Sequence, residues 1–152
     1  MIQRKQTLFL LAALILTVVL YFLPLAEMKA TTHYIYKLCY LKENGTDNHF
    51  LFYPYGNSIL NSLLLLVLLG IIFLYKKRNL QMKFCGLAIL LNTGIIASVF
   101  FYAEAYSSKL GAESINYSYG LFIPIINAIL IYIALRYIRK DEMLVKAANR
   151  LR

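Results

Sequence analysis

The chain of 152 residues has few acidic residues and little charge of any kind. Asp and Glu together contribute seven residues against 16 Lys and Arg, and charged residues make up only 15% of the chain, whereas hydrophobic residues make up 61%. A soluble domain of this length needs more polar surface than this composition provides. The scarcity of charge therefore argues against an ordinary soluble domain and favours an integral membrane protein.

Charges are scarcest within four long apolar segments. Each has about 18–20 residues and is free of charged residues apart from Arg136; they are Thr7–Leu25, Ser58–Tyr75, Phe84–Ala103 and Leu121–Ile138. A helix of this length spans roughly 27–30 Å, the thickness of a bilayer's hydrocarbon core. We therefore expect residues 1–152 to form one all-α membrane domain, a four-helix transmembrane bundle. A cleaved signal peptide is the alternative for the first segment, but the stretch is longer than usual and no small-residue cleavage site follows Pro24.

The basic residues are unevenly distributed among the connecting segments. The N-terminus, the loop 76–83 and the chain from Arg136 onward hold 12 of the 16 basic residues and two acids, whereas the other two loops hold four bases and five acids. By the positive-inside rule, both termini are expected in the cytoplasm, with residues 139–152 extending the fourth helix as a basic tail on membrane lipid or on a protein partner. Because topology accounts for the net charge of +9, no nucleic-acid partner is expected.

Cysteine and histidine are too few for most redox or metal chemistry. Cys39 falls in the first outer loop and Cys85 at the cytoplasmic start of the third segment, so a bilayer would separate the two thiols. His33 and His49 share the first outer loop, but no spacing of Cys, Asp or Glu completes a metal site around them. We therefore expect no catalytic, metal-binding or cofactor-binding residues, no cofactor and no enzyme activity.

The first outer loop, residues 26–57, carries the pattern of β-strands. Aromatic and β-branched residues alternate along Thr32–Leu41, and a second short run covers His49–Tyr53. Between them lies Asn44-Gly45, the strongest short hairpin signal, because both residues tolerate the positive φ of a type I′ turn. The loop is therefore predicted to form a small extracytoplasmic β-hairpin.

A two-residue turn would set the register of this hairpin and place Lys42 opposite Asp47. A lone hairpin is only marginally stable in water, so a third strand is expected. The segment Ser114–Tyr119 in the second outer loop is the candidate, which would give a three-stranded sheet drawn from both outer loops.

Polar residues inside the four apolar segments are mostly uncharged. The amides of Asn92 and Asn127 are expected to hydrogen-bond between helices as packing contacts, since an ion or proton pathway normally needs ionisable groups at that depth. Gly94 and Ser98 form a small-xxx-small pair, which predicts that the third helix lies at the centre of the bundle. Glu104, at the outer boundary, is the best single functional candidate, although a boundary carboxylate is usually just solvated.

Short polar motifs at the two ends of the chain resemble those of a known family. Residues Met1–Thr7, reading MIQRKQT, lead into the first segment, and Lys140–Lys146, reading KDEMLVK, precede the closing residues Asn149–Arg152. They are similar to the ends of a family of small four-helix Bacteroidota membrane proteins, a domain of unknown function (number 4293). Lys5 and Asn149 depart from its pattern, in which an apolar residue and Asp are usual. The resemblance implies the bacterial inner membrane and brings no activity.

Neither helix periodicity nor topology requires these particular terminal residues. We hypothesise that Gln3, Arg4 and Gln6 meet Asp141 and Glu142 at the cytoplasmic face. Arg4 would pair with one of the two acids, or the set would dock on a membrane complex. The expected function is a non-enzymatic accessory or scaffold subunit of a cell-envelope complex. A small transporter or lipid-handling protein is the alternative, and it would need a polar or lipid-sized cavity between the helices.

Overall fold

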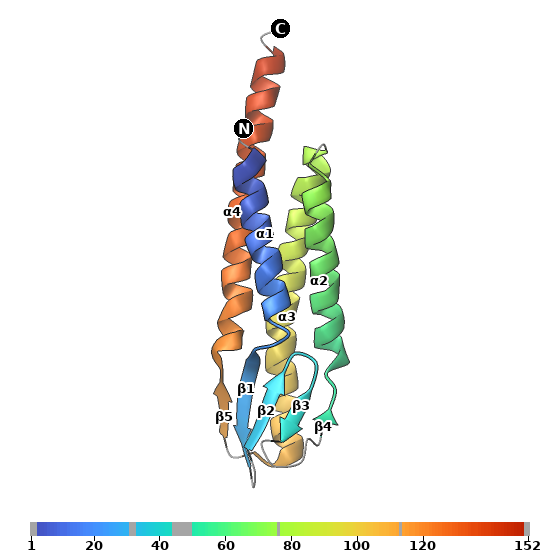
Figure 1. Ribbon diagram of the computed structural model, residues 1–152, viewed down its shortest axis with the longest axis vertical. Helices are drawn as coiled ribbons and strands as arrows, with labels where there is room; N and C mark the ends of the chain where they lie inside the picture. The colour runs from blue at the N-terminus through green and yellow to red at the C-terminus, as the bar shows by residue number, and fades with distance from the viewer. Residues whose placement is uncertain (1–2, 31–32, 44–49, 76, 113, 151–152) are drawn as a thin grey trace.

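The computed structural model describes residues 3–30, 33–43, 50–75, 77–112 and 114–150, with side chains from Gln6 to Ala147 apart from these gaps and Phe50. Four helices form an elongated bundle that stands on a small antiparallel sheet (Figure 1). The helices are α1 (Gln3–Val19), α2 (Tyr55–Phe73), α3 (Arg78–Leu110) and α4 (Phe122–Arg150). The sheet occupies one end of the molecule, the sheet end. Both chain termini and the α2–α3 turn lie at the other, the tail end.

Helices α2, α3 and α4 are long and apolar enough to cross a membrane, over Tyr55–Phe73, Arg78–Leu110 and Tyr119–Ala147. The apolar part of α1, Gln6–Val19, is shorter. The prediction that the first helix reaches Leu25 was wrong, because the chain turns after Val19 and enters a strand at Pro24. The third helix was predicted as Phe84–Ala103, which is shorter than α3 (Arg78–Leu110). The helix continues through the charged residues on both sides of its apolar run.

The helices form a ring in which each packs against two neighbours. Helix α1 contacts α2 and α4, and α3 contacts the same two helices, so the predicted antiparallel pairing of α2 with α3 is confirmed. The prediction of a central third helix was wrong. A Cβ atom added at Gly94 would meet nothing within 4 Å, and the hydroxyl of Ser98 donates to the backbone oxygen of Ile95 in its own helix. The small residues therefore bring no second helix close.

The sheet has five antiparallel strands in the order β4-β3-β2-β1-β5, more than the predicted hairpin or three-stranded sheet. The strands are β1 (Pro24–Lys29), β2 (His33–Lys37), β3 (Leu41–Glu43), β4 (Phe50–Phe52) and β5 (Ser114–Tyr117). Strand β1 was missed because its alternating pattern follows directly on the apolar run of α1. The third predicted strand exists as β5, but it pairs with β1 at the edge of the sheet.

The predicted strand Thr32–Leu41 is divided by a tight turn, in which the N–H of Lys37 donates to the carbonyl oxygen of Tyr40 at 2.9 Å. The predicted register of the following hairpin was also wrong. Lys42 pairs with Phe50 beside an irregularity in the ladder, and Asp47 lies outside the described residues. The Asn44-Gly45 turn lies outside them as well.

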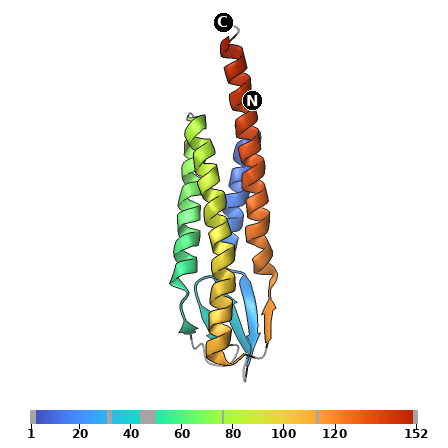
Figure 2. The same ribbon diagram turned by 180° about the vertical axis from the view of Figure 1, so that it is seen from behind.

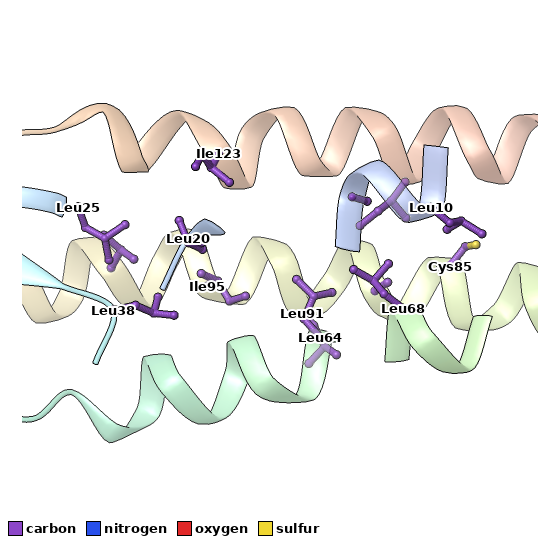
Figure 3. Packing of buried hydrophobic residues seen from close by; sticks show 14 of the residues in the cluster. Leu10, Leu20, Leu25, Leu38, Leu64, Leu68, Cys85, Leu91, Ile95 and Ile123 are labelled. Carbon is purple, nitrogen blue, oxygen red and sulfur yellow. The ribbon is translucent and has the colours of Figure 1, made fainter. Parts of the chain in front are cut away.

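The inner face of the sheet packs on the end of α3 (Figure 2). Aromatic rings make this contact. Tyr36 meets Tyr106 edge-on at 5.9 Å between ring centroids, and Phe52 stacks on Tyr106 at 5.3 Å between centroids. Leu25 and Leu38 are fully buried beneath the sheet and belong to the same apolar cluster as the helix interiors (Figure 3). Sheet and bundle therefore share one core.

Candidate functional site

A polar contact joins the first and last helices at the tail end of the bundle. The amide Nε2 of Gln6 donates a hydrogen bond to Oδ2 of Asp141, and both side chains are more than nine-tenths buried. The guanidinium of Arg78 donates to the backbone oxygen of Asp141 at 3.4 Å. Because a buried carboxylate needs hydrogen-bond donors to offset its lost hydration, this junction favours one alignment of α1, α3 and α4.

The structure thus brings together two of the five residues in the hypothesised docking set. Glu142 lies beside them but forms an ion pair with Lys146, one helical turn further along α4, at 3.5 Å. The Lys146 side chain of this pair is 64% exposed, and such a half-exposed pair adds little stability. The side chains of Gln3 and Arg4 lie outside the described residues, so the pairing of Arg4 with an acid stays a prediction.

Helix α4 continues past this junction to Arg150 and stands clear of the other helices (Figure 1). Three consecutive apolar side chains of this extension are exposed: Met143, Leu144 and Val145. They are flanked by the exposed Lys140 and Lys146. We call Lys140–Lys146 the tail segment. Neighbouring exposed apolar side chains of this kind make the tail segment a candidate contact surface.

A second polar group, the middle tier, lies around Thr17, between the Gln6–Asp141 junction and the sheet and close to the end of α1 at Val19. The hydroxyl of Thr17 donates to the backbone oxygen of Ala13 at 2.8 Å and accepts from Nδ2 of Asn127 at 2.9 Å. Asn61 donates to the backbone oxygen of Thr17 at 3.1 Å. Three helices therefore converge on Thr17, a residue that sequence reasoning did not single out because one hydroxyl in an apolar run carries no pattern.

Asn92 makes a similar contact between α3 and α4, donating to the backbone oxygen of Pro124 at 2.7 Å. The structure thus places both Asn92 and Asn127, expected as packing amides, in hydrogen bonds between helices. The buried Oδ1 atoms of Asn57, Asn61 and Asn127 have no hydrogen-bond partner among the described residues. On Asn57 the amide nitrogen does have one, because it donates to the hydroxyl of Tyr36.

An apolar layer separates the middle tier from the Gln6–Asp141 junction. Every helix contributes to it with side chains at most 8% exposed, namely Leu10, Ala13, Leu64, Leu68, Ile71, Cys85, Ala88, Leu91, Ile131, Ala134, Leu135 and Ile138. Along α1 the two polar levels are 11 residues apart, about 16 Å at the rise of an α-helix. The Gln6–Asp141 junction and the middle tier are therefore separate polar levels; the other buried polar side chains among the described residues are Asn57, Gln81 and Asn92.

The remaining candidates for chemistry are scattered. Glu104 is exposed on α3 and His33 is exposed on β2, whereas His49 lies outside the described residues. Cys39 and Cys85 are free thiols in different parts of the molecule. Within the described ranges, no three His, Cys, Asp or Glu side chains are grouped so that they could hold a metal ion.

Three helices long and apolar enough to cross a membrane, amide contacts between helices and a polar junction at one end define a four-helix bundle that carries a small antiparallel sheet. The chain belongs to the family described as Domain of unknown function (DUF4293), whose family model matches residues 2–151. The resemblance carried by the two terminal motifs is thereby confirmed. A comparison with curated proteins finds no match.

Proposed function

We propose that this protein spans the bacterial inner membrane with four helices and serves as a non-enzymatic accessory or scaffold subunit of a cell-envelope complex. Both termini would lie in the cytoplasm and the sheet outside. The position of the basic residues in the structure supports this orientation. Lys77, Arg78, Lys83 and Arg139 all lie at the tail end, where the positive-inside rule places the cytoplasm.

The observation that carries the scaffold role is the buried Gln6–Asp141 contact at the base of the tail segment. Because both side chains are buried, they act on a partner only by holding α4 in place. The docking surface itself consists of the three exposed apolar residues of the tail segment, Met143, Leu144 and Val145. A protein partner with an apolar surface next to the membrane fits this segment, because burying three such side chains supplies favourable free energy without a buried charge.

Affinity purification from native membranes tests the role. We expect Met143→Ser with Leu144→Ser to lose the partners that the unchanged protein retains. Asp141→Ala should weaken the same partners, since it releases the alignment of α4. The matched control is Leu51→Ser, which alters an exposed apolar side chain at the sheet end. If the tail variants retain the same partners as this control, the scaffold proposal is wrong.

The apolar layer between the two polar levels supports this role over the transport alternative. A transported polar solute would have to cross about 16 Å lined by buried aliphatic side chains. Transport would therefore require the helices to separate, and the α1–α4 pair is held together by hydrogen bonds at both levels.

A further inference from the structure

Two adjoining hollows open at the tail end on the side of α4 that faces α3. The first has a volume of about 660 Å³ and is lined in part by Lys77, Arg78 and Glu142. The second, of about 550 Å³, is lined by Lys83 and Arg139. Asn79 lines both, so the hollows adjoin at the first turn of α3. We call this combined surface the basic cleft; none of the described side chains of α1 lines it.

The basic cleft carries more positive charge than its surroundings neutralise. Among the described residues, four basic side chains line it, and the one acid, Glu142, already pairs with Lys146. Lys77, Lys83 and Arg139 are exposed, and none of them forms an ion pair with a described residue. The positive-inside rule would explain basic residues near this end, but it would not explain why they lie around adjoining hollows.

The walls of the basic cleft are partly apolar and lead onto the lipid-facing side of the helices. Leu80 and Val145 line the first hollow. Along α3, Lys83 lies between Leu80 and Leu87, which occupy the same helix face and are 39% and 43% exposed. A charged group held at Lys83 would therefore lie next to the exposed apolar side chain of Leu87, one helical turn further along α3.

We propose that the basic cleft binds the headgroup of an anionic phospholipid, whose acyl chains lie along the exposed face of α3 that continues from Lys83 to Leu87 and Leu90. The phosphate is complementary in charge to the basic side chains, and the apolar face of α3 is complementary to the acyl chains. A water-soluble phosphate compound would have no use for this apolar face. The inference rests on the proposed membrane location and is independent of any protein partner.

Native mass spectrometry of the purified full chain in detergent tests the site. Phosphatidylglycerol and phosphatidylcholine with identical acyl chains are titrated separately. We expect the anionic lipid to bind at least about tenfold more tightly. Lys83→Ala with Arg139→Ala should weaken its binding by about tenfold or more, because each basic group near an anionic surface contributes a comparable attraction. Lys83→Arg with Arg139→Lys should keep most of the affinity.

The matched control removes the same charge at the other end of the molecule, with Lys29→Ala and Lys109→Ala. It should leave the affinity within about twofold, and circular dichroism should show unchanged helix content in every variant. Equal binding of both lipids, or equal losses in the cleft and control variants, would overturn the proposal. So would inorganic phosphate that displaces the lipid at matched headgroup concentration, since the site would then recognise free phosphate. No partner is present in the purified sample, so failure here leaves the scaffold role untouched.

Discussion

Gln6 and Asp141 lie 135 positions apart in the sequence and are joined by a hydrogen bond from the amide nitrogen to the carboxylate. The same two helices are also linked at the other end of the bundle. There α1 leads into β1 and β5 leads into α4, and these strands pair with each other. Helices α1 and α4 are therefore fastened at both ends, once by main-chain hydrogen bonds and once by side chains. The tail segment extends from this doubly fastened pair.

The Gln6–Asp141 contact should contribute measurably to stability. We expect Asp141→Ala to lower the free energy of unfolding by about 1–3 kcal/mol, because it leaves the amide of Gln6 buried without its acceptor. Asp141→Asn should cost less, since its carbonyl oxygen can still accept. Denaturant unfolding in detergent, followed by circular dichroism, measures both. Glu142→Ala is the control, because it breaks only a half-exposed ion pair; an equal loss in that variant would contradict a special role for the buried contact.

Thr17 should couple α1 to α4 in the middle tier. Thr17→Val keeps the side-chain shape but removes the acceptor of Asn127, and should cost roughly 0.6–2 kcal/mol. In a double-mutant cycle with Asn127→Leu, the two losses should be less than additive, because both changes remove the same hydrogen bond. Thr93→Val provides the control, since its exposed hydroxyl bonds only within α3. Strict additivity would show that the two side chains do not interact.

Two glycines should respond in opposite ways to the same substitution. A Cβ atom at Gly120 would lie 2.4 Å from the backbone oxygen of Pro24, so Gly120→Ala must displace β1 or η1 (Tyr119–Leu121). A loss of about 1–3 kcal/mol is expected from such overpacking. Gly94→Ala meets open space and should be neutral or stabilising by up to about 1 kcal/mol, because alanine favours the helix. Thermal unfolding of the two variants compares them directly; similar melting temperatures would refute the close packing at Gly120.

Tyr36 should make the sheet end sensitive to alkali. Burial, with smaller contributions from Tyr106 and Tyr102, raises the pKa of Tyr36 above its ordinary value of about 10. The folded state therefore favours the neutral phenol more than the unfolded state does. This stabilisation is fully present below pH 10 and declines as the pH rises above it. Stability measured from pH 8 to 11.5 should fall more steeply for the unchanged protein than for Tyr36→Phe, and parallel curves would contradict this origin.

The proposed orientation predicts which end is accessible from outside the cell. In a chain carrying Cys39→Ser and Cys85→Ser, a new thiol at the exposed position Asn116 should react with a membrane-impermeant maleimide in intact spheroplasts. A thiol at the exposed position Lys146 should react only after the membrane is permeabilised. The reverse pattern would place the tail outside and invert the proposed topology.

Much of the architecture follows from local properties of the sequence. Four apolar runs predict four helices, because each run satisfies the same length requirement wherever it packs. The short connection between the second and third runs requires antiparallel neighbours, and the unbroken chain after Arg136 predicts the extension of α4. The terminal motifs identified the family for a similar reason, since they are recognised as contiguous residues. These features depend on sequence neighbours alone.

Other features depend on contacts between distant residues, and only the tertiary structure decided them. Strand β1 could not be separated from α1 by hydropathy, because its first residues, Pro24–Ala26, continue the apolar run of the helix, and its strand partners β2 and β5 are supplied by distant parts of the chain. The importance of Thr17 depends on Asn127 being opposite, and the basic cleft depends on α3 and α4 meeting at Asn79 and Arg139. The apolar runs and the terminal motifs were sufficient to predict four helices and the family. Packing decided the five-stranded sheet, the ring of helices and the burial of Gln6 against Asp141, because each arises from contacts between residues far apart along the chain.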